Sequence, residues 1–213
     1  LKDYKRVPVH FVFDVKFDLR RKARLVAGGH LTQPIFNDAP YTGIASIKSI
    51  RTCIFLGKLN KLRIFIGDVG NAYLKALTKE QLYIVAGPDF GELEGCILIV
   101  EKALYGLRTS GARWAERLAD SLRKLRFSSS YTNPAIWMRE NEDHWEYICV
   151  WVDDIIVISE NPEAIFDALG KEYTLKGAGE PEYNQGADMK NMEEPEKVFI
   201  IGIETYIKRC LTV

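Results

Sequence analysis

Apolar and polar residues alternate near the start of the chain, and this alternation predicts the first strand. A period of two is typical of a strand that buries one of its faces. A turn over residues 18–21 and a second strand over residues 22–27 follow, so we predict a β-hairpin. The apolar residues of the first strand, each separated from the next by one residue, are Phe11, Phe13, Val15 and Phe17.

A helical period appears in two longer segments. Isoleucines recur at helical spacing from Ile44 up to Gly57, and a longer apolar stripe runs from Ala112 to Phe127. Asn161 followed by Pro162 is typical of a helix start, which predicts a third helix through Leu169. Shorter helical segments are expected over residues 71–75 and 205–211.

Short apolar runs bounded by turn residues predict further strands. Two such runs flank an acidic pair within residues 147–158, and a loop rich in Pro, Asn, Thr and Gly is expected over residues 32–43. The chain is therefore expected to mix helices and strands. The remaining predicted strands cover residues 62–66, 82–85, 96–100 and 198–203.

The acidic pair, Asp153 and Asp154, lies at the bend between its two apolar runs. Neighbouring carboxylates repel each other and are costly to desolvate, so the arrangement favours a bound cation. Asp68 follows the strand of residues 62–66 and precedes the acidic pair by 85 residues, 153 minus 68. If the two strands are neighbours, three carboxylates meet, and such oxygen ligands suit Mg²⁺. We therefore predict a magnesium-dependent enzyme.

The first hairpin is strongly basic. Five of the nine residues from Lys16 to Arg24 are Lys or Arg. Lys22 and Arg24 are two residues apart on a strand, so they project from the same face. A solvated, charged edge strand is one explanation, and a phosphate-binding arm is the other.

The overall composition is that of an ordinary globular protein. The chain has 213 residues, of which 47% are hydrophobic, enough for a sizeable core. Lys plus Arg equals Asp plus Glu at 29 each, so no global field attracts nucleic acid or anionic lipid. Any site for a polyanion must therefore come from local clustering.

The cysteines and the ends of the chain indicate an intracellular fragment. The four cysteines contain no CxxC pair, and Cys53, Cys96 and Cys149 lie in apolar surroundings, so buried reduced thiols are expected rather than disulfides or a metal knot. No apolar run is long enough to span a membrane, and no leader is recognised, so we expect a soluble protein. Because the chain begins at Leu1 within a strand-like pattern, we expect it to be part of something longer.

Two motifs resemble those of reverse transcriptases. Asp68-Val69-Gly70-Asn71-Ala72-Tyr73-Leu74 resembles their first polymerase motif, and Trp151-Val152-Asp153-Asp154 resembles their aromatic-x-Asp-Asp box. The segments of residues 22–28 and 103–110 resemble more closely the reverse transcriptase of Ty1/copia retrotransposons. The matches follow the order of the family over residues 11–186.

The resemblance implies an α+β fold with the fingers and palm of a right-hand polymerase. The palm would be a mostly antiparallel sheet backed by helices, and the thumb would be absent or truncated. The implied parts are fingers over residues 1–60 and 77–111, palm over 61–76 and 112–190, and the start of a connection to the thumb over 191–213.

The resemblance also implies roles for single residues. Asp68 and Asp153 would hold two Mg²⁺ ions, or Mn²⁺ as a substitute, with the Val69 carbonyl assisting and Asp154 in support. Lys176 would protonate the leaving pyrophosphate, although an ordinary exposed lysine is the alternative. The implied contacts to the deoxynucleotide are Lys22 and Arg24 at the triphosphate, Tyr73 as a filter against the 2′-hydroxyl, and Tyr105 and Gly106 against the nascent base pair.

The implied activity is RNA-directed DNA polymerisation within a retrotransposon polyprotein. Its partners would be an RNA or DNA template with primer, dNTPs, and the thumb and RNase H regions of the polyprotein, in a cytoplasmic virus-like particle or replication complex. Trp151 departs from the usual tyrosine or phenylalanine, so an inactive relic that only binds nucleic acid is the alternative. A phosphoacceptor receiver domain is a third reading, but there the acidic pair precedes the lone aspartate.

Overall fold

The computed structural model describes residues 2–15, 19–31, 43–181, 183–184, 187–192, 198–202 and 204–211. The predicted loop of residues 32–43 lies almost wholly outside the described residues, as do Lys16 and Phe17 of the basic hairpin. Within the described residues, no helix is long and apolar enough to cross a membrane.

The chain forms two compact units, each built from separate stretches of sequence. The first contains Leu1–Thr42 and Asn71–Ser121, and the second contains Gly43–Gly70 and Leu122–Val213. Residues 43–60, which we assigned to the fingers, belong with the second unit because the helix they contain packs on its sheet. Whether the units are the fingers and palm remains a prediction.

The first unit contains two small sheets. Strands β2 (Val9–Val15) and β3 (Arg21–Ala27) form the predicted antiparallel hairpin. Strand β5 (Leu77–Val85) pairs with β6 (Ile97–Lys102) and, in parallel, with the short β1 (Lys5–Arg6). The other elements are 3-10 helices at Gly29–Leu31, Ala72–Lys75 and Pro88–Leu93, and most of helix α2 (Ser110–Lys124).

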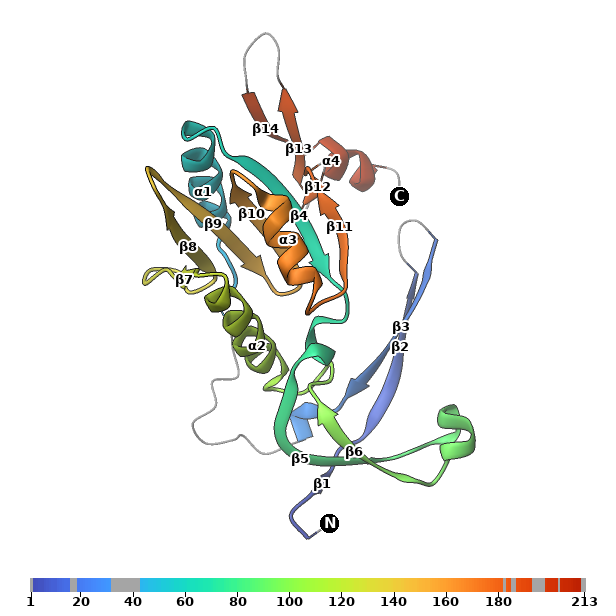
Figure 1. Ribbon diagram of the computed structural model, residues 1–213. Coiled ribbons are helices and arrows are strands. Elements are labelled where there is room, and N and C mark those ends of the chain that lie inside the picture. The colour runs from blue at the N-terminus through green and yellow to red at the C-terminus, as the bar shows by residue number, and fades with distance from the viewer. Residues whose placement is uncertain are drawn as a thin grey trace. The chain divides into compact units, whose positions relative to one another are not determined.

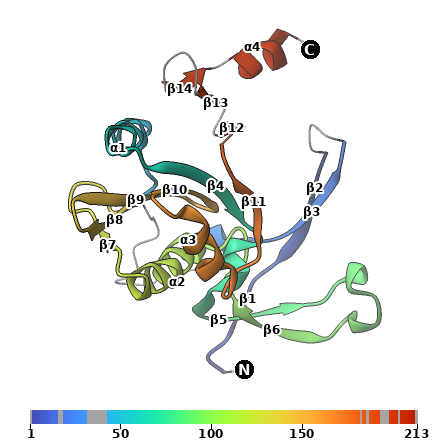
Figure 2. The ribbon, with the colours of Figure 1, turned by 45° about the horizontal axis from the view of Figure 1, so that its top comes forward.

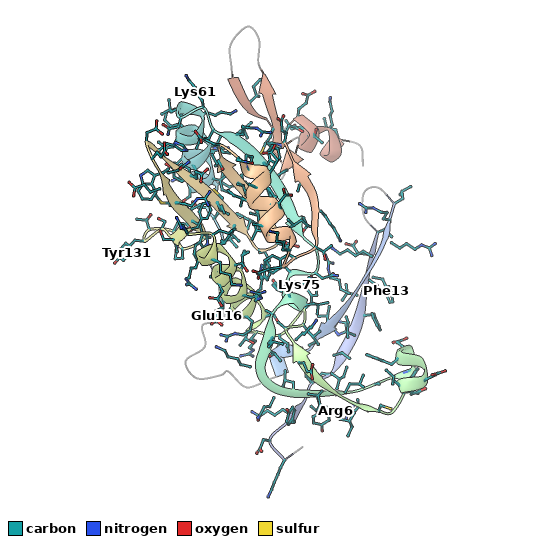
Figure 3. The ribbon with its side chains drawn as sticks, viewed as in Figure 1. Arg6, Phe13, Lys61, Lys75, Glu116 and Tyr131 are labelled. Atoms are coloured by element: carbon teal, nitrogen blue, oxygen red, sulfur yellow. The ribbon has the colours of Figure 1, made fainter. Side chains whose placement is uncertain are left out.

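The hairpin departs from the sequence prediction in its burial. The alternating face of β2 was expected to be buried, but Phe13 is 77% exposed and projects from the hairpin, as Figure 3 shows. Val15 is exposed as well. Packing is concentrated at the other end of the hairpin, where Val9 and Ala27 join a core cluster and the Phe11 ring lies 6.3 Å from that of Phe90.

The second unit is built on a six-stranded sheet. Its strand order is β11-β4-β10-β9-β8-β7, and every described pairing is antiparallel. The neighbouring strands β4 and β10 carry two of the predicted acids, Asp68 and Asp154. The strands are β4 (Arg63–Val69), β7 (Ser128–Ser129), β8 (Ile136–Asn141), β9 (His144–Trp151), β10 (Asp154–Ser159) and β11 (Leu175–Gly179).

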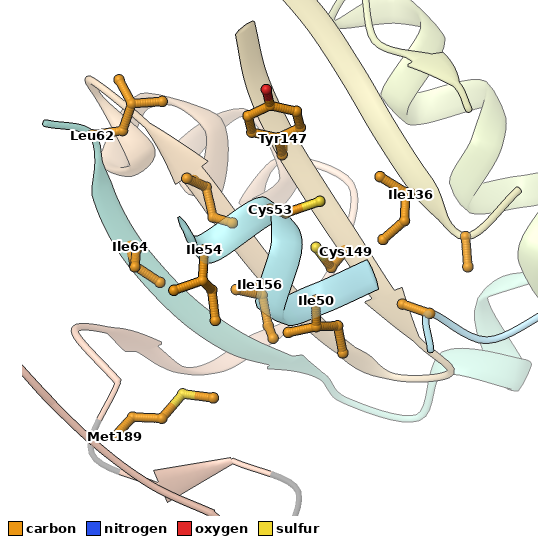
Figure 4. Packing of buried hydrophobic residues seen from close by; sticks show 13 residues of the cluster. Ile50, Cys53, Ile54, Leu62, Ile64, Ile136, Tyr147, Cys149, Ile156 and Met189 are labelled. Carbon is orange, nitrogen blue, oxygen red and sulfur yellow. The ribbon is translucent and has the colours of Figure 1, made fainter. Parts of the chain in front are cut away.

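Helices α1 (Ile47–Leu59) and α3 (Pro162–Gly170) lie on opposite faces of this sheet (Figures 1 and 2). A Cβ on Gly57 of α1 would collide with Ile158, and a Cβ on Gly67 would lie 2.6 Å from the Phe166 ring of α3. Both glycines therefore let a helix approach the sheet closely. Figure 4 shows the core under α1, where Ile50 and Ile54 meet Ile64 and Ile156.

The last elements of the second unit follow β11. They are β12 (Tyr183–Asn184), β13 (Ala187–Met192), β14 (Val198–Gly202) and α4 (Glu204–Leu211). Strand β13 pairs with both β12 and β14. The predicted strand over residues 198–203 and the helix over 205–211 are thus confirmed with small shifts.

The other helices are confirmed with corrected ends. Helix α1 begins at Ile47 because the Ser46 side chain accepts a hydrogen bond from the Ser49 N–H. Helix α2 ends at Lys124, three residues early, because Arg126 has φ of 66° and leaves the helical conformation. Helix α3 has the predicted Asn161 cap, whose side chain accepts from the Ala164 N–H at 3.1 Å.

The three cysteines that the structure describes, Cys53, Cys96 and Cys149, are free, but only Cys53 and Cys149 are buried. Cys53 on α1 and Cys149 on β9 lie beside each other in the core, as Figure 4 shows, and their thiols share a hydrogen bond. Cys96 is exposed, so its predicted burial is wrong. It lies between Gly95, which has φ of 78°, and the start of β6.

Candidate functional site

The three predicted acids lie at one end of the neighbouring strands β4 and β10. Asp154 begins β10 and lies directly opposite Asp68 of β4 in the antiparallel register. Residues directly opposite each other in such a pair project from the same face, with Cα atoms roughly 4.5–5.5 Å apart. The sequence could not show that these strands are neighbours, and the register now shows it.

Asp153 lies in the two-residue turn that joins β9 to β10. Trp151 pairs with Asp154 across this turn. The turn residue Val152 has φ of 57°, which is costly for a β-branched side chain. The Val69 N–H donates a hydrogen bond to the Asp153 carbonyl oxygen at 2.8 Å, so the end of β4 holds the turn directly.

The pKa of Asp154 depends on both other acids. Burial raises the pKa of its carboxyl group to about 6, and the charges of Asp153 and Asp68 add to this rise. An ordinary aspartate titrates near pH 4. The three carboxyl groups therefore form one electrostatic cluster in which a neighbouring cation would relieve repulsion.

The donor chemistry fits Mg²⁺, because carboxylate oxygens are its preferred protein ligands. The cluster is nevertheless looser than a finished metal site. Within the described part of the chain, no three His, Cys, Asp or Glu side chains converge closely enough to hold a metal ion. Ligation by Asp68, Asp153, Asp154 and the Val69 carbonyl therefore remains a prediction.

Lys176 lies beside the acids in the same sheet. On β11 it pairs with Asp68, so one row across three strands contains Lys176, Asp68 and Asp154. The lysine side chain runs over Gly70, where an added Cβ would lie 3.1 Å from the lysine Cε and 3.5 Å from its Nζ. Gly70 thus leaves room for the Lys176 side chain. The sequence did not predict this contact, because glycine is common beside strand ends and the lysine lies far away along the chain.

The first unit contains the predicted nucleotide contacts. Lys22 and Arg24 lie opposite Asp14 and Val12 on one face of the hairpin, as the spacing predicted. Both side chains are half-buried, which fits a solvated edge strand less well than an arm with a defined contact. The Arg24 guanidinium carbon lies 5.8 Å from the centre of the Tyr105 ring.

Tyr105 and Gly106 are held against the end of β3. Tyr105 forms a β-bridge with Val26, and its carbonyl oxygen accepts a hydrogen bond from the Ala27 N–H at 2.7 Å. Gly106 has φ of 88°, and a Cβ there would collide with the Ala27 carbonyl oxygen. Glycine is therefore required at this position by both conformation and space. The ring of Tyr73 lies 4.9 Å from that of Tyr105.

Sequence reasoning also missed a clamp on the neighbouring loop. Arg108 donates from its guanidinium to the carbonyl oxygens of Gly29 and His30, at 3.1 and 2.9 Å. The sequence signal that could have indicated this contact is the position of Arg108 directly after the Tyr105-Gly106-Leu107 motif. The clamp holds the 3-10 helix that follows β3, close to where Tyr105 is anchored.

The site residues thus fall into two groups. The second unit contains the three aspartates, Val69 and Lys176. The first unit contains Arg24, Tyr73, Tyr105 and Gly106. Lys22 lies on the same hairpin face as Arg24. As a class, the molecule is a mixed α/β protein with several sheets and few helices, consistent with a reverse transcriptase domain.

Comparison with known proteins gives the family. Residues 1–209 match the family model described as reverse transcriptase (RNA-dependent DNA polymerase). The chain is 31% identical over 170 residues to the Transposon Ty1-MR1 Gag-Pol polyprotein of Saccharomyces cerevisiae, covering 78% of the chain and 10% of that polyprotein. It is 33% identical over 173 residues to the Truncated transposon Ty1-A Gag-Pol polyprotein of the same yeast, covering 78% of the chain and 14% of that polyprotein.

The chain therefore belongs to the reverse transcriptase family of the Ty1/copia retrotransposon type. This membership confirms the resemblance stated from the motifs and excludes the receiver domain. The chain spans about a tenth of the length of the Ty1-MR1 relative.

Proposed function

We propose that this chain is the RNA-directed DNA polymerase domain of a copia-type retrotransposon polyprotein, with the first unit as fingers and the second as palm. It would add deoxynucleotides to the 3′-hydroxyl of a primer. The observation that supports this most is the register of β4 and β10, which sets Asp68 opposite Asp154 and next to the Asp153 turn.

Each unit has its own task in this proposal. In the second unit, Asp68 and Asp153 would hold the metal ions with help from the Val69 carbonyl and Asp154. The chemistry that bound Mg²⁺ would supply there is activation of the primer hydroxyl and stabilisation of the charge on the leaving pyrophosphate. Lys176, which pairs with Asp68 and whose side chain lies over Gly70, would donate a proton to that leaving group.

In the first unit, the residues would bind and select the incoming nucleotide. Lys22 and Arg24 project from one face of the hairpin and would contact the triphosphate. Tyr73 would exclude a 2′-hydroxyl by steric contact. Gly106, where a side chain has no room, would allow the backbone to approach the nascent base pair.

The proposal is tested by primer extension on an RNA template with dNTPs and Mg²⁺. Asp153→Asn keeps the size of the side chain but removes a charge that the metal ions would need, so we expect extension to fall roughly 10²- to 10³-fold, the scale of electrostatic catalysis. Asp167→Asn is the matched control, because Asp167 is exposed on α3, and this variant should extend normally. Extension by Asp153→Asn at the control rate would refute the proposed role.

The alternative is a relic that binds nucleic acid without chemistry. Trp151, which stands where the family usually has tyrosine or phenylalanine, is the observation that favours it. Binding of a template with primer, without incorporation of any dNTP, would support this alternative.

The partners follow from the proposed reaction. They are an RNA or DNA template with primer, dNTPs, and the thumb and RNase H regions of the polyprotein. The Gag-Pol names of the relatives support the polyprotein context. We propose a cytoplasmic virus-like particle or replication complex as the setting.

A further inference from the structure

Three side chains of the first unit, Arg24, Tyr105 and Tyr73, contact one another in a row. The Arg24 guanidinium carbon lies 5.8 Å from the centre of the Tyr105 ring, and the centre of the Tyr73 ring lies 4.9 Å from that of Tyr105 at an interplanar angle of 57°. A guanidinium within about 6 Å of a ring is attracted by the ring electrons. Tilted ring pairs at this distance are favourable as well. Tyr105 is therefore the middle member of this row.

The backbone of Tyr105 is fixed independently of its ring. It is joined to β3 by the bridge with Val26 and by the hydrogen bond from the Ala27 N–H. The following Gly106 fits so tightly against Ala27 that no side chain could be added there. Tyr105 thus presents its ring from a defined anchor.

The backbone of Tyr73 belongs to a much smaller element. It lies in the four-residue 3-10 helix that follows Asn71, a non-glycine residue with φ of 55°. One link from this helix to the rest of the unit is the hydrogen bond from the Ala103 N–H to the Ala76 carbonyl oxygen at 3.0 Å. The half-buried Tyr73 ring needs a neighbour to fix its orientation, and the Tyr105 ring is such a neighbour.

We propose that Tyr105 is a positioning residue for the sugar filter: its ring holds the Tyr73 ring at the angle that excludes the 2′-hydroxyl of a ribonucleotide. This inference rests on the proposed polymerase function and deepens it. The role is distinct from a contact of Tyr105 with the base pair, because it acts through Tyr73 and concerns the sugar.

The two contacts of Tyr105 predict different kinetic effects. Loss of its contact with Arg24 weakens triphosphate binding, which dNTPs and rNTPs share, so it raises KM for both. Loss of its contact with Tyr73 changes only the discrimination between the two sugars. The ratio of kcat/KM for a dNTP to that for the matching rNTP therefore isolates the contact between the tyrosines.

The test is single-nucleotide incorporation by the chain and four variants, with dNTP and rNTP in parallel. Tyr105→Leu should lower the discrimination ratio roughly three- to ten-fold, the range that corresponds to the loss of one aromatic pair. Tyr105→Phe keeps the ring and should keep the ratio. Tyr73→Ala should lower it further, and Tyr131→Leu, at a fully exposed tyrosine of the second unit, should leave it unchanged.

The outcomes separate this inference from the proposed function. An unchanged ratio in Tyr105→Leu, together with a lowered ratio in Tyr73→Ala, overturns the inference and leaves the polymerase intact. Failure of the unaltered chain to incorporate any nucleotide contradicts the proposed function itself.

A second measurement tests the positioning without any activity. NMR of the chain with ¹³C-labelled tyrosine reports the ring environment of Tyr73. We expect its ring signals to shift in Tyr105→Leu, because the neighbouring ring current is lost, and to stay close to their original positions in Tyr105→Phe. Unshifted Tyr73 signals in Tyr105→Leu would show that the rings do not hold each other.

Discussion

Asp154 shows at the scale of one residue what the acidic cluster costs the folded chain. Burial, and then the charges of Asp153 and Asp68, raise its pKa to about 6. A raised carboxyl pKa means that the folded chain holds this proton more tightly than the unfolded chain does. Stability is therefore lost as the pH rises from about 4, the unfolded value, through about 6.

The first prediction is that Asp154→Asn stabilises the metal-free chain at pH 7. The amide removes the buried, repelled charge, so we expect a gain on the order of 1–2 kcal/mol after allowance for partial exposure of the group. Urea unfolding at several pH values measures it. The gain should be present at pH 7 and vanish near pH 4, and an equal gain at both pH values would contradict the electrostatic origin.

The second prediction concerns Gly70 and Lys176. Gly70→Ala introduces a Cβ 3.1 Å from the lysine Cε, so the lysine must shift. We expect kcat for incorporation to fall about tenfold with little change in KM, a part of the 10²–10⁴-fold effect of a general acid. The basic limb of the pH profile should change as well, which a purely structural defect would not cause.

Gly87→Ala is the control for this prediction, since Gly87 has open space around its Cβ position and an ordinary negative φ. It should leave kcat unchanged. Equal rates for the two glycine variants would mean that Gly70 does not position the lysine.

At the scale of elements, a buried ion pair ties together the three strands β8, β9 and β10. Glu146 on β9 is 2% exposed and accepts hydrogen bonds from Arg139 Nε at 2.8 Å and from the Ser159 hydroxyl. Burial alone would raise the Glu146 pKa, but the bonds from Ser159 and Arg139 outweigh it and lower the pKa. A lowered pKa contributes stability above the unfolded value that is lost as the pH falls through the folded one.

The third prediction is that Glu146→Gln destabilises the chain at pH 7 by about 1–3 kcal/mol. The charge-assisted hydrogen bonds are lost, because the neutral amide of glutamine is a weaker acceptor for the Arg139 guanidinium than the carboxylate. Chemical unfolding at pH 7 and pH 4 measures the effect. The deficit should shrink at the lower pH, where the wild-type carboxylate becomes protonated. Glu140→Gln, at an exposed position of β8, should be neutral, and a pH-independent deficit in Glu146→Gln would argue for a packing defect instead.

Elements were predictable from sequence where their signal is local. The hairpin, α1 and α3 follow from alternation, helical period and the Asn161 cap, because these patterns depend on adjacent residues. Strand β11 was missed because its segment, Leu-Lys-Gly-Ala-Gly, has little apolar content and is fixed by pairing with β4. Strand β8 was missed as well, and its position is likewise set by pairing with β9.

At the scale of the whole molecule, the two units are each assembled from distant stretches of chain. Sequence reasoning singled out the candidate acids, since the motifs around Asp68 and Asp153 are specific, and the register sets Asp68 opposite Asp154. It did not predict that α1 belongs with the sheet of the second unit, because helix and sheet meet only through tertiary packing. The contact between Tyr73 and Tyr105 was equally hidden, because nothing in the spacing of 32 residues, 105 minus 73, indicates it.

The most direct test of the polymerase assignment is the rate at which the chain adds one dNTP to a primed RNA template with Mg²⁺. We predict Mg²⁺-dependent addition that Asp153→Asn abolishes and Asp167→Asn retains. Addition that proceeds equally well in Asp153→Asn, or nucleic-acid binding with no addition by the unaltered chain, would contradict catalysis at the Asp68, Asp153 and Asp154 cluster.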